Sequence, residues 1–216
     1  MTEKKFSHIP VLLKETIDFL AVRRGGTYVD ATLGLGGHSF EIARRIGREG
    51  TLIGFDKDPA ALELARKRLS EPPVELQGDW PMIRYEQGSF AQIGEVVETG
   101  SVDGLMADLG VSSLQLEDAS RGFSFQAEGP LDMRMDPMSG MSADQVVNRI
   151  DERTLADLIY EFGEERRSRR IARAIVRARP VRSTKQLVDV ISAAAPTMNR
   201  PTTGKSGRRQ LHSRRR

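Results

Sequence analysis

Short apolar runs alternate with amphipathic stretches through the first half of the chain. Residues 28–31, 51–56 and 101–108 have the length and apolar content of buried strands, and residues 38–46 have the apolar spacing of a helix. An amphipathic helix is also predicted over residues 9–20. Strands that alternate with helices are typical of a parallel sheet with helices packed on its faces. The pattern therefore predicts an α/β fold.

The second half of the chain has no strand pattern. Residues 121–136 are rich in Gly, Pro, Met and Phe and show no clear period. Helical patterns then cover residues 142–149, 154–162, 164–178 and 183–194. Ser142, Thr154 and Ser183 stand where N-caps are expected. We interpret this half as an all-helical lobe inserted into the α/β core.

A glycine-rich turn lies between the first predicted strand and the helix after it. Gly34, Gly36 and Gly37 allow a tight turn and a close approach of the backbone to a ligand. Asp56 ends the next strand, where a carboxylate can accept hydrogen bonds from both hydroxyls of a ribose. The structural alternative is that the glycines only form a strand-to-helix turn. The functional interpretation is a nucleoside-containing cofactor.

Two features favour a cofactor without phosphates. The NAD fingerprint G-x-G-x-x-G requires a third glycine, and Ser39 occupies that position. Asp30 precedes the turn, where its carboxylate would repel a pyrophosphate but would suit the cationic end of a methionyl group. S-adenosylmethionine (SAM) is therefore the expected cofactor. An NAD-dependent oxidoreductase is the competing enzyme class.

Aspartates recur at or near the ends of the predicted strands. Asp30, Asp56 and Asp108 each occupy such a position. In open α/β sheets, ligands bind outside the carboxyl ends of the strands. Asp108 is therefore expected where cofactor and acceptor meet, with a helix N-cap or turn residue as the alternative.

Five sequence strings carry a resemblance to a known family. They are Asp30–His38, Phe55–Pro59, Asp108–Ser113, Arg121–Phe125 and Gly129–Asp136. In order and spacing they resemble the bacterial 16S ribosomal RNA cytosine-N4 methyltransferases, the RsmH or MraW family, over roughly residues 6–195. The resemblance implies a Rossmann-like SAM-dependent core. It also implies methyl transfer to the exocyclic N4 amine of a cytidine in 16S rRNA near the decoding centre, with the small ribosomal subunit as partner.

The resemblance also implies roles for individual residues. The binding residues that match the family's motifs are Gly36, Gly37 and His38 in the glycine turn, Asp56 at the ribose, Phe90 near the adenine, and Asp108 and Gln115 on the acceptor side. One departure is Leu114, where the family usually has proline. Residues 71–85 also look longer than usual and are interpreted as a surface insertion.

The chemistry of this reaction needs alignment more than an activated nucleophile. The cytosine amine is a weak nucleophile because its lone pair is delocalised into the ring, so positioning supplies much of the catalysis. Asp108 is the expected catalytic residue, as acceptor for the amine hydrogens. The chain has no cysteine, which excludes a covalent thiolate route through the pyrimidine ring. His38 is not favoured as a base, because the start of a helix disfavours its charged form.

Composition and sequence pattern limit the other kinds of site and location that can be expected. His8, His38 and His212 lie in unrelated contexts, so no metal site is predicted. No apolar run approaches 18 residues, and the N-terminus lacks the apolar region of a signal peptide, so no membrane association is expected. The absence of cysteine suits the cytoplasm. A homodimer is left open.

Two segments suggest contact with RNA. Residues 166–179 predict a helix with an apolar stripe and arginines over the rest of its surface, which is either a solvated face or a phosphate track. Phe123 and Phe125 lie beside Arg121 and Arg134, a combination that suits base stacking and phosphate contact. The alternative for this second segment is a solvent-exposed loop.

Charge is uneven along the chain. The whole chain carries +3, yet seven basic residues and no acidic one follow residue 189, which leaves residues 1–189 at −4. The expected division is a SAM-binding core over residues 1–112 with the first four strands, a loop and helical substrate-recognition lobe over 113–195, and a basic, disordered tail over 196–216.

The family continues after the helical lobe with strands that complete a larger sheet, and no later strand pattern is found here. A C-terminal truncation is therefore expected, which would leave the sheet incomplete, with an open apolar edge and marginal stability. It also raises a different class of function, a non-catalytic RNA-binding or ribosome-assembly protein that has kept half of a methyltransferase.

Overall fold

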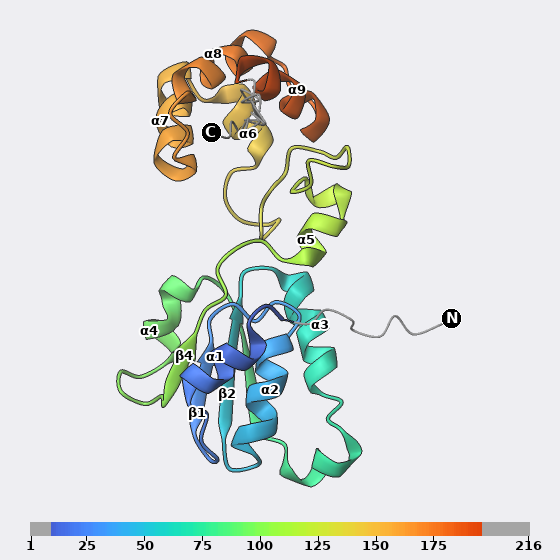
Figure 1. Cartoon of the computed structure of the whole chain (residues 1–216), viewed down its shortest axis with the longest axis vertical. Coiled ribbons are helices and arrows are strands. Elements are labelled where there is room, and N and C mark those ends of the chain that lie inside the picture. Colours follow the sequence, from blue (N-terminus) through green and yellow to red (C-terminus); the bar gives the residue numbers. More distant parts are fainter. Residues whose placement is uncertain (1–9, 196–216) are drawn as a thin grey trace, which may run out of the picture.

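The computed structural model of the chain describes residues 10–195, and it shows a layered α/β core below a helical lobe (Figure 1). The expected tail over residues 196–216 lies outside the described residues. The core elements are α1 (Leu13–Leu20), β1 (Thr27–Asp30), α2 (Gly37–Ile46), β2 (Thr51–Asp56), α3 (Pro59–Leu69), η1 (Val74–Asp79), β3 (Met82–Gln87), η2 (Phe90–Gln92), α4 (Ile93–Val96) and β4 (Gly104–Met106). The later elements are α5 (Ser113–Glu117), η3 (Ala119–Arg121), α6 (Ala143–Arg149), α7 (Glu152–Gly163), α8 (Ser168–Ala178) and α9 (Thr184–Ala194).

The core is built on one parallel sheet, which confirms the predicted α/β class. The strand order is β3-β2-β1-β4, and every neighbouring pair is parallel. Val29 of β1 is paired with Ile53 of β2 on one side and with Leu105 of β4 on the other. The connection from β2 to β3 runs to one side of β1, and β4 lies on the other side. This reversal of strand order is where ligands bind in such sheets.

The two faces of the sheet bury different residues, because side chains alternate along a strand. Tyr28 and Leu52 pack with residues of α1 and α2, including Ile17 and Ile42. On the opposite face, the adjacent strand residue Val29 packs in a separate cluster with Ile53, Phe55 and Val97. Both faces of the central strands are therefore covered, which explains why β1 and β2 read as continuous apolar runs.

The interpretation of residues 71–85 as a surface insertion is wrong for its second half. Met82 begins β3, which pairs along its whole length with β2. Trp80 donates its indole N–H to the carbonyl of Leu69 at 2.9 Å and lies 5.3 Å, ring to ring, from Phe40. The strand was missed because it lies at an edge of the sheet and carries exposed polar residues.

The lobe has its own hydrophobic core, formed by residues of α6, α7, α8 and α9 and by Leu131. Ser142 and Ser183 are N-caps, as predicted, and accept hydrogen bonds from Gln145 N and Gln186 N. The predicted cap Thr154 is wrong: Asp151 caps α7 and accepts from the backbone of residues 153 and 154. An aspartate is as good a cap as a threonine, so the helix simply begins earlier.

The first residue of α9 joins this helix to the segment that precedes the lobe. Thr184 donates its backbone N–H to the Gly129 carbonyl at 3.0 Å and accepts the Gly129 N–H on its Oγ1, also at 3.0 Å. Its hydroxyl donates to the carbonyl of Ala127 at 3.1 Å. Thr184 is itself buried. The segment around Gly129 is thus fastened to the lobe by three hydrogen bonds.

The strand β4 is an edge of the sheet among the described residues. It pairs with β1 alone, and Leu105 is 49% exposed. Leu109 and Val111, just beyond the strand, are exposed as well. An unpaired edge beside exposed apolar side chains favours association between chains. This is the open edge that the sequence led us to expect.

We therefore expect Leu105→Lys to reduce self-association without loss of stability, since a lysine on an edge strand opposes edge-to-edge pairing. Light scattering after size-exclusion chromatography, at several protein concentrations, measures the self-association. The matched variant is Met106→Lys, at the next position but buried, which should instead lower the melting temperature because it buries a charge. Equal self-association of Leu105→Lys and wild type would contradict the role of this edge.

Candidate functional site

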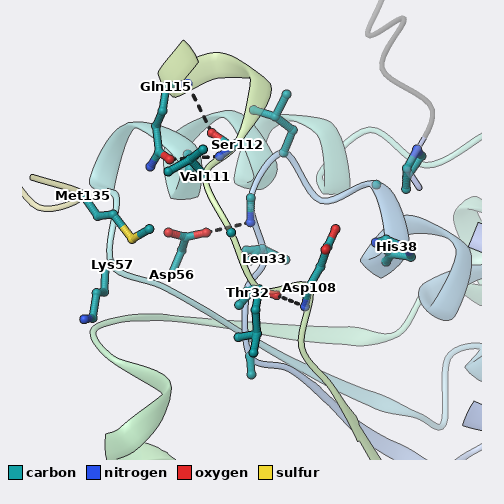
Figure 2. Close-up of a pocket in the computed structure, with 18 of the residues that line it drawn as sticks. Thr32, Leu33, His38, Asp56, Lys57, Asp108, Val111, Ser112, Gln115 and Met135 are labelled. Carbon is teal, nitrogen blue, oxygen red and sulfur yellow. Dashed lines mark hydrogen bonds between the residues drawn. The ribbon is translucent and has the colours of Figure 1, made fainter. Parts of the chain in front are cut away.

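A cavity of about 440 Å³ lies at the carboxyl ends of β1, β2 and β4 (Figure 2). Among the residues predicted for the site, the structure brings six to the lining of this one cavity: Gly37, His38, Asp56, Phe90, Asp108 and Gln115. They come from four separate parts of the sequence. Their convergence makes this cavity the candidate site.

The glycine turn gives the cavity one wall. Gly34 and Gly36 have positive φ angles of 51° and 72°, and Gly36 is the N-cap of α2. A Cβ on Gly37 would lie 2.4 Å from Cγ of Pro10, so only glycine fits there. Gly36 itself is not among the lining residues, and a Cβ on it would meet Leu69 of α3 at 3.4 Å. Its position is needed for the turn and for packing between helices.

Asp56 ends β2 and lies half-buried at the cavity. Its Oδ2 accepts the Gly34 N–H at 2.7 Å and its Oδ1 accepts the Asp58 N–H at 2.9 Å. Burial raises the pKa of Asp56, and these backbone hydrogen bonds partly oppose the shift. Each carboxylate oxygen has two lone pairs, so both can accept a further hydrogen bond from a ligand. The carboxylate is held in place and retains the capacity to accept.

Asp30 does not face the cavity, so the expectation that it meets a cationic ligand is wrong. Its side chain is buried, accepts the Ser39 hydroxyl at 2.7 Å and the Thr32 N–H at 3.1 Å, and is not among the lining residues. Burial raises the pKa of Asp30. Asp30 instead fastens the start of α2 to the end of β1.

Asp108 follows β4 and lines the cavity with an exposed side chain. Its backbone N–H donates to the Thr32 hydroxyl at 2.6 Å, which ties the loop after β4 to the loop after β1 (Figure 2). No hydrogen bond holds the Asp108 carboxylate among the described residues. The backbone is therefore fixed while the carboxylate is available to a ligand.

Phe90 and His38 contribute an aromatic and an imidazole ring to the lining. Phe90 begins η2 behind the N-cap Ser89 and is 47% exposed. His38 Nε2 lies 3.2 Å from the Val11 carbonyl, an acceptor, which assigns the proton of a neutral ring to Nε2. This contact ties the start of α2 to the segment before α1.

Gln115 is buried and held from both ends. Its Oε1 accepts the Ser112 N–H at 3.0 Å in a capping box, and its Nε2 donates to Asp58 Oδ2 at 3.0 Å. The same Oδ2 accepts from Arg121 Nη1 at 2.8 Å. Leu114, the departure from the family pattern, lies within α5 and leaves these bonds intact. Gln115 therefore reaches the cavity as part of a buried network.

Arg121 does not serve as an exposed phosphate contact. Its side chain is 15% exposed, and its guanidinium pairs with the buried Asp58. Arg134 likewise pairs with Asp132 at 2.7 Å. Phe125 is exposed, in line with the loop alternative as well as with stacking. The two arginines of this segment are thus engaged within the protein.

The arginine-rich helix α8 has the predicted apolar stripe, with Ile171 and Ile175 buried in the lobe core. Arg173 pairs with Glu152 at 3.2 Å, and Arg179 donates to the Val147 carbonyl at 2.8 Å. Its remaining exposed arginines without an ion pair in the described chain are Arg169, Arg170 and Arg177. They form a basic surface on the lobe.

Several residues that the sequence did not assign to the site also belong to it. Thr32, Lys57 and Met135 line the cavity, and Asp58 supports it from below. Thr32, Lys57 and Asp58 lie inside the two motifs that contain the glycine turn and Asp56. Met135 lies inside a further one of the five strings, Gly129–Asp136, but nothing in the sequence assigned this methionine to the site.

The cavity suits a nucleoside cofactor better than a dinucleotide. A pyrophosphate site needs free backbone N–H groups at the glycine turn, whereas the Gly34 N–H is already donated to Asp56. The carboxylates of Asp56 and Asp108 would oppose a pyrophosphate. A ribose diol and a cationic centre are compatible with both.

A family model described as the MraW methylase family matches residues 5–213. The chain belongs to this family. The match extends beyond residue 195, to which the motif resemblance reached.

Among its relatives, the ribosomal RNA small subunit methyltransferase H of Koribacter versatilis is 63% identical over 196 residues, covering 91% of this chain and 63% of that protein. The protein of the same name from Acidobacterium capsulatum is 62% identical over 191 residues, covering 88% of this chain and 64% of the relative. That of Solibacter usitatus is 51% identical over 197 residues, covering 89% and 66%. The chain spans slightly less than two thirds of the length of these relatives.

Two other classes of site are absent from residues 10–195. No group of three or more His, Cys, Asp or Glu side chains is arranged to hold a metal ion. None of the helices in this part of the chain has both the length and the apolar character needed to cross a bilayer.

The burial of Asp30 makes a prediction about stability and pH. Because its pKa is raised in the folded state, the folded protein holds this proton more tightly than the unfolded chain does. Stability from this group is present at low pH and is lost as pH rises through the raised pKa. Asp30→Asn removes this titration and can keep both hydrogen bonds.

We expect the melting temperature of Asp30→Asn, relative to wild type, to be higher at pH 7 than at pH 4. Thermal unfolding followed by circular dichroism at both pH values measures it. A difference between the two proteins that does not change with pH would show that Asp30 stays charged when buried. Asp103→Asn, at an exposed aspartate, is the control.

Proposed function

We propose that this chain binds SAM and transfers its methyl group to the exocyclic N4 amine of a cytidine in 16S rRNA near the decoding centre. The observation that carries the proposal is the convergence of Asp56, Phe90 and Asp108 on one cavity at the switch point of the sheet. Membership of the MraW methylase family and the names of the relatives support it. The partner we propose is the small ribosomal subunit, in the cytoplasm.

The residues that would hold SAM come from the lining of the cavity. Asp56 would accept the ribose hydroxyls and Phe90 would contact the adenine. Gly37 and His38 would lie at the glycine turn, with Gly36 shaping it, and Gln115 would act through the loop after β4. Bound SAM supplies an electrophilic methyl group on a sulfonium. Lys57 also lines the cavity and adds a positive charge to it.

Asp108 is the proposed catalytic residue. Its carboxylate is available in the cavity, while its backbone is fixed by Thr32. As an acceptor it would bind an N–H of the cytosine amine, localise the lone pair on nitrogen and orient it. Methylation of the amine would release one proton from its nitrogen, and the Asp108 carboxylate is suited to accept that proton.

The helical lobe is the proposed recognition unit, as the division at residue 113 implies. The exposed arginines Arg169, Arg170 and Arg177 on α8 would contact rRNA phosphates, which neutralise such charges without sequence preference. Phe125 is an exposed aromatic side chain suited to base stacking. Arg121 and Arg134 have no part in this surface.

The first test is calorimetric titration of the 216-residue chain with SAM, with NAD as the control. We expect saturable binding of SAM alone, and at least about tenfold weaker binding by Asp56→Ala, since two charge-assisted hydrogen bonds are lost. A folded wild-type chain that does not bind SAM would overturn the proposal. Asp103→Ala is the matched control, at an exposed aspartate outside the cavity.

The second test separates binding from chemistry. Asp108→Asn should bind SAM within about threefold of wild type while losing methyl transfer from labelled SAM to small ribosomal subunits by at least about a hundredfold. Thr32→Val should lose part of the activity, because it frees the backbone of Asp108. Full transfer by Asp108→Asn would remove this carboxylate from the mechanism.

The raised pKa of Asp56 adds a pH dependence to SAM binding. The charged carboxylate is the stronger acceptor, so affinity should fall on acidification, beginning above the ordinary range of an aspartate. Titrations between pH 4 and pH 8 measure it, and Asp56→Asn should show a flatter profile. A wild-type affinity that is constant over this range would contradict the role of Asp56.

A further inference from the structure

Arg121 connects the core to the segment that leads into the lobe. Its Nη1 donates to Asp58 at 2.8 Å, while its Nη2 donates to the carbonyls of Arg134 at 3.0 Å and Met135 at 2.8 Å. The planar fork of one guanidinium thus spans a carboxylate of the core and two consecutive carbonyls of the segment. Asp58 is 1% exposed and Arg121 15% exposed, so little water competes for these bonds.

Met135 is the residue that this fork places at the cavity. It is the only methionine among the lining residues, and it shares the lining with Asp56 and Lys57. In Figure 2 its thioether extends toward the side of Asp56. The neighbouring methionines of the same segment do not take part, since Met138 is 91% exposed and outside the lining.

We infer that Met135 forms a wall of the nucleoside half of the cofactor site and that Arg121 is the positioning residue that holds it there. The inference rests on the proposed binding of SAM in this cavity. Asp56 marks the ribose end of the cavity, so a side chain beside it is placed to contact the nucleoside. The thioether of methionine is polarisable and packs favourably against ring systems.

The design of the support explains why an arginine stands at position 121. Only a guanidinium offers several N–H groups in a fixed plane, so that one side chain can satisfy Asp58 and two carbonyls together. A lysine would keep the charge beside Asp58 but could not keep all three bonds in this geometry. The segment that carries Met135 would then lose its tie to the core.

The binding test compares two methionines of one segment. Met135→Ala should bind SAM about five- to tenfold more weakly than wild type, because a buried thioether contact is lost. Met138→Ala should bind as wild type does. Arg121→Lys should weaken SAM binding by a similar factor, with Arg134→Lys as its control, since the Arg134 side chain pairs with Asp132 of its own segment.

A double variant tests whether Arg121 acts through Met135. If it does, Arg121→Lys combined with Met135→Ala should bind SAM no more weakly than the weaker single variant, since coupled residues are not additive. Independent contributions, with the two fold-changes multiplying, would overturn the assigned role of Arg121. Melting temperatures identify a variant that has lost its fold.

Oxidation of the wild-type chain tests the position of Met135 without any substitution. Hydrogen peroxide converts an accessible thioether into its sulfoxide, and peptide mass spectrometry follows each methionine. S-adenosylhomocysteine at saturation should slow oxidation of Met135 several-fold and leave the rate at Met138 unchanged. NAD at the same concentration should protect neither.

The outcomes separate this inference from the function on which it rests. A wild-type chain that does not bind SAM overturns both. Wild-type SAM binding together with unchanged binding by Met135→Ala and no protection of Met135 overturns the inference alone. Weakened binding by Met135→Ala, with Met138→Ala unchanged and with Met135 protected, supports it.

Discussion

The structure depends on one buried carboxylate. Asp58 accepts from the N–H of Ala60, where it caps α3, and from the side chains of Gln115 and Arg121. Gln115 and Arg121 lie 57 and 63 residues further along the chain. One side chain therefore joins the end of the strand that carries Asp56 to the loop after β4 and to the segment that leads into the lobe. A buried charge is costly unless it is paired and hydrogen-bonded, so these segments cannot separate without leaving it unsatisfied.

Hydrogen bonds from backbone N–H groups to side chains fix the rest of the site. The Gly34 N–H is donated to Asp56, and the Asp108 N–H to Thr32. Loops after three different strands are therefore fastened to one another before any ligand enters. The side chains that remain available, chiefly the carboxylates of Asp56 and Asp108, are presented by a rigid frame, and such preorganisation reduces what a ligand must order on binding.

The sequence predicted elements whose signals are local. The strand over residues 51–56 has its predicted bounds, and Ser142 and Ser183 are the predicted caps. Prediction from the sequence failed where contacts between residues far apart in the chain determine the structure. The edge strand β3 was interpreted as part of an insertion because it carries exposed polar residues. Asp30 is buried and accepts the Ser39 hydroxyl, and Arg121, which seemed suited to RNA, pairs with Asp58. Most of the cavity lining lies in the motifs, and so do Asp58 and Met135. The contact of Asp58 with Gln115 and the place of Met135 at the cavity join residues far apart in the sequence, and no local pattern shows them.

The segment between η3 and the lobe is fastened at both ends, by Arg121 to the core and by Gly129 to Thr184 at the start of α9. Its length is fixed by these two attachments, whereas the identity of an exposed side chain between them, such as Phe125, is not. Evolution can therefore vary the chemistry of this surface one residue at a time. An insertion or deletion between Arg121 and Gly129 would pull one fastening against the other, whereas beyond residue 136 the chain reaches the exposed Met138 before the first helix of the lobe.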